Sequence, residues 1–252
     1  MAKNIFYINA SLNDGKKSIL EVSADFIDLM FQFGEVDPVF LSPVYIRKDI
    51  KSSIKLTKGE IENAVAGLAN IILESHKSDI LQHEKVGDPT IDFSRDFGFL
   101  LMFEFFKEER MAFSMMARLG ASEYNELKIE FLIESPESDF NWYFSVLKGI
   151  VDSRVPVYGG VVIKLPAFFD PFKTLKVWPP LGWISYFSND GAIKIPDDLK
   201  GVEYEHTDKG KFLILTREDF TTSKEVYETH RDKLLDIMKE LKSRVPEYSE
   251  KK

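Results

Sequence analysis

The sequence predicts an α+β protein in which two halves, each with helices and an antiparallel sheet, form one compact unit. Four segments carry apolar residues at three- and four-residue steps, the spacing of amphipathic helices. Strand-like runs follow one another across short turns in the middle of the chain and near its end, which indicates antiparallel hairpins. The order helix, multistrand sheet, helix occurs once in each half. We therefore expect a single domain over residues 1–252, with similar halves at about 1–126 and 127–252.

The first predicted elements are a strand, a helix and a second short strand. Residues 4–12 predict the strand, and an Asn-Asp-Gly turn follows it. Ser18 and Glu21 match the Ser-x-x-Glu capping box, after which an apolar stripe continues at helical spacing. Gly34 is expected to end this helix. Residues 39–46 predict a short strand or edge segment, because their proline has no N–H for a sheet ladder.

A second helix and a meander of strands follow. Thr57 and Glu60 match a second capping box, before a helix that we expect to end near His76. The polar, turn-rich residues 77–94 predict a surface loop. Three strand-like runs then predict an antiparallel meander, in which a Lys-Glu-Glu-Arg turn joins the first two. These runs are residues 97–106, 111–120 and 127–133.

The second half begins and ends with a helix. Residues 138–154 predict the third helix, and residues 157–165 predict a strand that bends at two glycines. Residues 202–216 predict a hairpin around an Asp-Lys-Gly turn. The last helix is expected to start at a third capping box, which begins at Thr222, and the polar tail from Pro246 is expected to fray.

The composition argues against several classes of protein. Apolar residues make up 44% of the chain, enough for a sizeable core. The net charge of −8 disfavours a dedicated nucleic-acid binder, because phosphate contacts need a basic surface. The chain has no cysteine, which excludes disulfides, thiolate metal ligands and a cysteine nucleophile. No apolar run suits a signal peptide or a membrane-spanning helix, so we expect a cytoplasmic protein.

No motif predicts a catalytic centre, a cofactor or a metal site. The four histidines have none of the spacings typical of zinc sites. Residues 96–98 match the Asp-Phe-Gly motif of protein kinases, but the Gly-rich loop and the other kinase motifs are missing. Asp197 and Asp198, ahead of Lys200, suggest a magnesium-dependent nuclease centre, which would also need a basic surface for phosphate. Solvated charges beside a turn are the simpler interpretation.

Residues 178–190 concentrate aromatic surface beside turn residues. The segment holds two of the three tryptophans, two adjacent prolines and a Gly-Trp pair. A structural corner, a partner surface and a small-ligand pocket would each explain it, since aromatic side chains fill cores and also anchor interfaces. The structural corner is the interpretation that the residues favour, with the other two left open.

The same segment resembles the immunity protein 52 family. Trp178 and the run Gly-Trp-Ile-Ser-Tyr-Phe-Ser at 182–188, followed by Ile195-Pro196, a hairpin and a terminal helix, are similar to the C-terminal half of that family. Residues 26–40 (FIDLMFQFGEVDPVF) are similar to its first conserved block. The resemblance implies a bacterial antitoxin that is encoded beside a polymorphic or type VI secreted toxin, often one with a nuclease domain.

The resemblance implies a protein partner, and the sequence adds candidate contact residues. We expect stoichiometric, non-catalytic binding of a cognate toxin, with a basic nuclease as one candidate and with no direct contact to nucleic acid or membrane. A cytoplasmic enzyme and a generic interaction scaffold are the alternatives. Carboxylates can meet the basic cleft of a nuclease, and the candidates for this role are Asp88, Asp92, Glu134, Glu137 and Asp139. The family motif, which we expect to be structural, comprises Trp178, Gly182, Trp183 and Tyr186.

Overall fold

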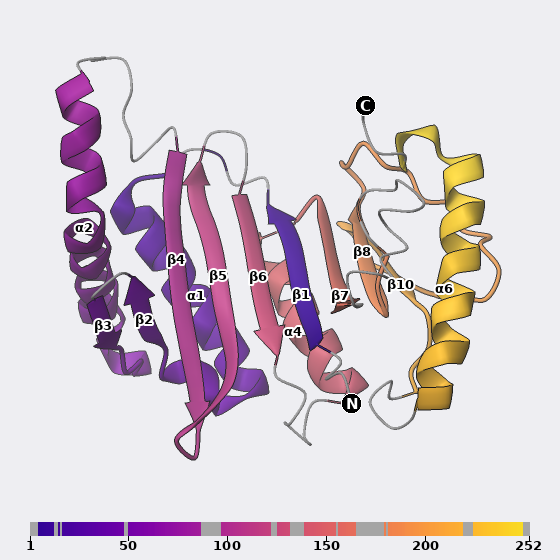
Figure 1. Ribbon diagram of the computed structural model, residues 1–252, viewed down its shortest axis with the longest axis horizontal. Coiled ribbons are helices and arrows are strands. Elements are labelled where there is room, and N and C mark those ends of the chain that lie inside the picture. Colours follow the sequence, from indigo (N-terminus) through magenta and orange to yellow (C-terminus); the bar gives the residue numbers. More distant parts are fainter. Residues whose placement is uncertain are drawn as a thin grey trace. The chain divides into compact units, whose positions relative to one another are not determined.

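The fold is α+β, as the sequence predicts (Figure 1). The computed structural model divides into two compact units. The N-terminal unit comprises Ser11–Leu132 and Asp152–Arg154, and the C-terminal unit comprises Met1–Ala10, Ile133–Val151 and Val155–Lys252. The structure describes residues 5–12, 15, 17–47, 50–86, 97–121, 125–131, 139–154, 156–164, 179, 181–218 and 224–248.

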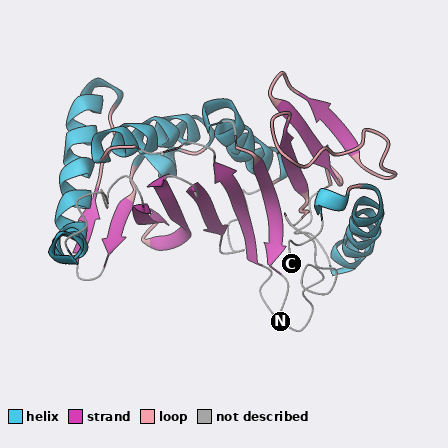
Figure 2. Cartoon of the chain, turned by 90° about the horizontal axis from the view of Figure 1, so that it is seen from above, coloured by secondary structure: helices cyan, strands magenta, loops and turns pink. Residues whose placement is uncertain are grey.

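The N-terminal unit contains antiparallel strands in the order β3-β2-β4-β5-β6. Helices α1 and α2 lie on one face of these strands, and no described helix of this unit lies on the other face (Figures 1 and 2). Its elements are α1 (Ile19–Val36), η1 (Pro38–Leu41), β2 (Val44–Arg47), β3 (Ile50–Ser53), η2 (Lys58–Glu60), α2 (Ile61–Val86), β4 (Phe97–Lys107), β5 (Arg110–Ala121) and β6 (Asn125–Phe131).

Alternation along β4 determines which side chains face the helices. Phe103 and Phe105 are buried, and Phe26 of α1 stacks on Phe103 with ring centroids 4.1 Å apart. Phe40 of η1 packs edge-on against Phe105 at 5.4 Å. Because successive strand residues point to opposite faces, the residues between these phenylalanines lie on the face away from the helices.

The C-terminal unit contains strands in the order β1-β7-β8-β10-β9. All five residues of β8 are buried. Tyr186 and its cross-strand partner Phe212 lie on the side of α4, since Phe144 of that helix contacts Phe212 at 5.1 Å. The elements are β1 (Ile5–Leu12), α4 (Phe140–Arg154), β7 (Tyr158–Lys164), β8 (Ile184–Ser188), β9 (Glu203–His206), β10 (Gly210–Ile214), α6 (Lys224–Arg244) and η4 (Pro246–Tyr248).

Helix α2 is longer than the sequence predicts. It continues to Val86, so residues 77–86 are helical and the loop expected over 77–94 is wrong for that part. The helix packs against the sheet near His76. The Ser75 and Tyr45 hydroxyls are hydrogen-bonded at 2.7 Å, and the ring centroids of His76 and Phe99 are 5.4 Å apart. These tertiary contacts hold α2 against the sheet at the point where the sequence predicted its end.

The second predicted capping box does not form. Thr57 makes no side-chain hydrogen bond as a cap, and a 3-10 turn, η2, leads into α2. The first box does form: the Glu21 N–H donates to Ser18 Oγ at 3.3 Å, and the Ser18 N–H donates to the Glu21 carboxylate at 2.7 Å. The third box begins at Thr222, which lies outside the described residues.

Gly34 lies inside α1 and does not end it. The helix continues to Val36, and the Asp37 N–H donates to the Phe33 carbonyl at 2.9 Å. A Cβ on Gly34 would lie 2.5 Å from Cδ2 of Leu41. The glycine therefore allows η1 to pack closely against α1, which is a tertiary requirement that the sequence pattern does not reveal.

Two further expectations differ from the structure. The short strand expected within residues 39–46 forms as β2, but η1 precedes it, and β2 lies between β3 and β4, so it is not an edge segment. The short, polar β3 was not predicted. The tail from Pro246 does not fray at once, because Pro246–Tyr248 form η4 and the Tyr248 side chain is fully buried. No helix of the described residues is long and apolar enough to cross a membrane.

Candidate functional site

Trp183 lies in the core of the C-terminal unit, immediately before β8. Its side chain is 0% exposed, and its indole Nε1 donates to the Thr216 carbonyl at 2.8 Å. The indole contacts the rings of Phe140 and Tyr143 on α4, with centroids 5.8 and 5.7 Å away. The backbone N–H donates to the Val161 carbonyl of β7 at 2.8 Å. One residue thus joins α4, β7 and the segment that follows β10.

The neighbouring motif residues also lie in this core. A Cβ on Gly182 would lie 2.1 Å from the Val161 carbonyl oxygen, so the chain can approach β7 only with glycine here. Tyr186 is fully buried, and its ring centroid lies 5.1 Å from that of Phe212. Trp178 lies outside the described residues. The three described motif residues therefore offer no exposed surface to a partner.

Two tyrosines of the same core are kept neutral by burial. Desolvation raises the pKa of the Tyr158 and Tyr248 hydroxyls well above the ordinary tyrosine value. Tyr158 also hydrogen-bonds to Ser185 of β8. The Ser185 Oγ accepts a further hydrogen bond from the Gly182 N–H at 3.0 Å. The hydroxyl of Ser185 thus has hydrogen-bond partners within the same core, which supports a structural role for it.

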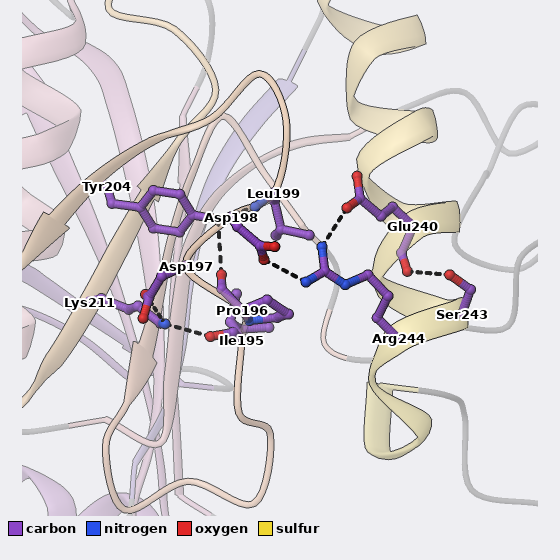
Figure 3. Close-up of polar contacts among 10 residues, drawn as sticks. All are labelled: Ile195, Pro196, Asp197, Asp198, Leu199, Tyr204, Lys211, Glu240, Ser243 and Arg244. Atoms are coloured by element: carbon purple, nitrogen blue, oxygen red, sulfur yellow. Dashed lines mark hydrogen bonds and ion pairs between the residues drawn. The ribbon is translucent and has the colours of Figure 1, made fainter.

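A loop after β8 connects the terminal hairpin to α6 (Figure 3). The Tyr204 hydroxyl donates to the Pro196 carbonyl at 2.9 Å and accepts from the Leu199 N–H at 3.0 Å. On the other side, the Arg244 guanidinium of α6 donates to Asp198 at 2.5 Å and to Glu240 at 2.6 Å. The loop is thereby held between two elements of the C-terminal unit.

The two adjacent aspartates of this loop have different partners. Asp197 accepts from Lys211 of β10, whereas Asp198 accepts from Arg244 of α6 (Figure 3). The hydrogen bond from Lys211 lowers the pKa of the Asp197 carboxyl. Each carboxylate is occupied by its own cation, which supports a structural interpretation of both. Among the described residues, no group of three or more His, Asp and Glu side chains could hold a metal ion.

Of the five predicted contact carboxylates, the structure describes one. Asp139 is exposed at the start of α4, where its carboxylate accepts from the Trp142 N–H at 2.9 Å. This hydrogen bond caps the helix. Outside the described residues lie the other four, Asp88, Asp92, Glu134 and Glu137. A contact between these carboxylates and a partner stays a prediction.

The N-terminal unit has an exposed sheet face that the sequence analysis missed. Met102 and Met111 are 47% and 38% exposed. Met102 lies opposite Met116 on β5, which in turn lies opposite Lys128 on β6. We call this surface the open sheet face, and its residues are Ile46, Leu100, Met102, Glu104, Met111, Ser114, Met116, Arg118, Glu126, Lys128 and Glu130.

The open sheet face combines an apolar centre with paired charges. A hollow of about 320 Å³ is lined by Ile46, Met102 and Met116 together with Lys128 and Glu130. The last two form an ion pair at 2.5 Å. An exposed apolar patch with a polar rim is typical of protein interaction surfaces, and methionine adapts its shape to a partner.

Sequence patterns gave only a weak signal for this face. The β4 run Phe-Gly-Phe-Leu-Leu-Met-Phe-Glu-Phe-Phe is apolar at nearly every position, so it predicts a strand buried on both sides. Glu104, Lys128 and Glu130 interrupt the apolar pattern at alternate positions. Which face stays uncovered depends on where α1 and α2 pack, and strand periodicity does not determine that.

Comparison with known proteins identifies a similar fold. No protein-family model and no curated protein sequence matches this chain. Among solved structures, the chain is similar to Pseudomonas aeruginosa T6SS protein PA0821, with a TM-score of 0.51 and 9% sequence identity. The similarity covers 93% of this chain and 73% of that chain. At this identity the comparison shows a shared fold.

Proposed function

We propose that this protein is an immunity protein that binds and neutralises a cognate secreted toxin. The observation that carries the proposal is the fold, which is similar over 93% of the chain to that of a T6SS protein. The resemblance of residues 182–188 to the immunity protein 52 family supports the same role. We expect the protein to act in the cytoplasm by stoichiometric binding, without turnover.

The open sheet face is the contact surface that we propose for the toxin. Its exposed methionines offer apolar area that a partner can bury, whereas Gly182, Trp183 and Tyr186 of the family motif are already buried within the C-terminal unit. The ion pair between Lys128 and Glu130 lies at its rim, where charges contribute more to orientation than to affinity. A basic nuclease remains the kind of toxin that suits the net charge of −8.

Co-expression with the toxin encoded by the neighbouring gene tests the proposal. We expect the wild-type chain to protect cells from growth arrest. Met102→Asp and Met116→Asp should each lose protection, because a carboxylate is introduced into the apolar centre of the contact. Leu20→Asp is the matched control, since Leu20 is 60% exposed on α1.

The outcomes of the co-expression experiment test the proposed immunity function and the proposed contact surface separately. If the wild-type chain fails to protect, the proposed function is wrong. If both methionine variants fold and protect as well as Leu20→Asp does, the toxin binds elsewhere. Thermal unfolding of the three purified variants shows whether a loss of protection reflects misfolding.

A further inference from the structure

Strand β3 is an edge strand, and no described strand pairs with its outer side. It stands at the end of the strand order, with β2 as its neighbour. The N–H of Ile54 donates to the Pro43 carbonyl at 2.9 Å, and the N–H of Leu56 donates to the Leu41 carbonyl at 2.9 Å. In an antiparallel pair the hydrogen-bonded residues alternate, so the residues between them direct their N–H and C=O groups away from β2. These outward residues are Lys51, Ser53 and Lys55.

A groove lies beside this edge. Its volume is about 270 Å³, and its lining includes Ser53 and Ile54 from the strand side and Ala64, Gly67, Leu68 and Ile71 from α2. The helix residues recur at three- and four-residue steps and form one stripe. Apart from its chain neighbours and the backbone of its own helix, no heavy atom of the described structure lies within 4 Å of a Cβ built on Gly67. The small residues at the middle of the stripe leave room for another chain.

We propose that this groove binds an extended peptide segment of a partner protein, which adds to β3 as a further strand. The outward N–H and C=O groups of Lys51, Ser53 and Lys55 would supply the ladder hydrogen bonds. Alternate side chains of the peptide would enter the groove above Ala64 and Gly67. When a peptide adds to an exposed sheet edge, main-chain hydrogen bonds give affinity and pockets for alternate side chains give specificity.

Local charge indicates the chemistry of the peptide. Lys55 is exposed and has no ion-pair partner among the described residues. Lys51 is 64% exposed in its side chain and lies 3.8 Å from Glu104, which is a weak contact. Lys55 itself lines the groove, together with the carboxylate residue Glu60 of η2, whereas Lys51 lies beside Glu104 on the open sheet face. The peptide should therefore place an acidic residue beside Lys55 and a small or medium apolar residue toward Ala64 and Gly67 of α2.

The test uses the full chain and needs no toxin, so it is independent of the proposed function. A phage-displayed library of 12-residue peptides is selected on the purified protein, and the enriched sequences are synthesised with a fluorescent label. Binding is then measured by fluorescence polarisation. Hydrogen exchange of the protein reports which backbone amides the peptide protects.

Two pairs of variants identify the binding site. Ser53→Pro removes one outward N–H and projects the proline ring toward the peptide, whereas Ser53→Ala keeps the N–H. Gly67→Trp fills the groove, whereas Gly67→Ala adds one methyl group. We expect Ser53→Pro and Gly67→Trp to weaken binding at least about tenfold, with the alanine variants within about twofold of wild type. All four variants should unfold at nearly the wild-type temperature, because Ser53 and Gly67 are exposed.

The expected hydrogen-exchange result is slower exchange at Lys51, Ser53 and Lys55 when peptide is bound. Failure to enrich any peptide, or binding that neither Ser53→Pro nor Gly67→Trp weakens, would overturn the proposal. A second copy of the chain is the competing occupant. If the wild-type protein is a dimer that Ser53→Pro converts to a monomer, and no peptide is enriched, then the edge serves self-association and the proposal is wrong.

Discussion

At the scale of single residues, Trp183 connects several elements of the C-terminal unit. It contacts two aromatic rings of α4 and hydrogen-bonds to Thr216. We expect Trp183→Ala to lower the free energy of unfolding by about 3–5 kcal/mol. Truncation of the side chain leaves a cavity, removes both ring contacts and deprives the Thr216 carbonyl of its hydrogen-bond donor. Urea unfolding followed by circular dichroism measures this. A variant with wild-type stability would mean that the indole does not pack as described.

Burial of tyrosine hydroxyls makes a second residue-scale prediction, which concerns alkaline pH. Burial raises the pKa of Tyr158 and Tyr248 in the folded state, whereas in the unfolded chain tyrosine titrates at about 10. The unfolded state therefore loses these protons first, so this contribution to stability is complete below pH about 10 and is lost as pH rises further. We expect stability to fall above that pH.

Tyr248→Phe isolates this effect. The variant should show a shallower loss of stability above pH about 10 than the wild type, because one titrating hydroxyl is gone. Urea unfolding at several pH values between about 9 and 11 gives the two slopes. Equal slopes would show that the Tyr248 hydroxyl is accessible to solvent in the folded protein.

At the scale of elements, the two N-terminal helices differ in how they begin. Ser18 and Glu21 form a reciprocal pair of hydrogen bonds, while Thr57 makes no capping bond with its side chain. We expect Ser18→Ala to cost about 1 kcal/mol of stability, and Thr57→Ala to change it by no more than a few tenths. Paired chemical unfolding curves provide the measurement. Equal costs would contradict the difference between the two caps.

The hairpin between β4 and β5 contains two residues in an unfavourable conformation. Glu108 and Glu109 have φ of 49° and 64°, the left-handed region that hairpin turns of type I′ require and that Asn-Gly adopts readily. The double substitution Glu108→Asn, Glu109→Gly should stabilise the protein by about 1 kcal/mol. The control Glu108→Gln, Glu109→Gln removes the charges without easing the backbone. If the control stabilises equally, repulsion between the glutamates is the cause.

The sequence predicts elements well where the local pattern decides them. The strand at Ile5–Leu12, the first capped helix, the meander and the terminal hairpin all have their own turn or cap signals. Prediction from the sequence fails where tertiary contacts determine the ends or the burial of an element. Helix α2 extends to Val86, the glycine at 34 serves packing, and Tyr248 is buried despite its polar neighbours. The open sheet face was missed because β4 is apolar on both faces, although Lys128 and Glu130 on β6 alternate with buried residues and mark the side that α1 and α2 leave uncovered.

At the scale of the whole molecule, the net charge of −8 predicts that electrostatic attraction speeds the association of a basic partner. Charge reversal at two or three of Asp88, Asp92, Glu134 and Glu137 should slow association by about tenfold at low ionic strength and have less effect at high salt. Asp139 needs a different change, since its carboxylate caps α4. Asp139→Asn keeps the cap and removes the charge. Stopped-flow rates that respond neither to salt nor to any variant would mean that the acidity does not guide the partner.

The central claim is that the protein neutralises its toxin by binding it. Titration of the purified toxin with the purified protein, with toxin activity measured at each ratio, tests this most directly. The account predicts a linear fall in activity that ends at a fixed molar ratio, does not change with incubation time and is shifted by Met102→Asp but not by Leu20→Asp. Progressive inactivation by a small fraction of one equivalent would show an enzyme, and undiminished toxin activity at excess protein would contradict the proposed function.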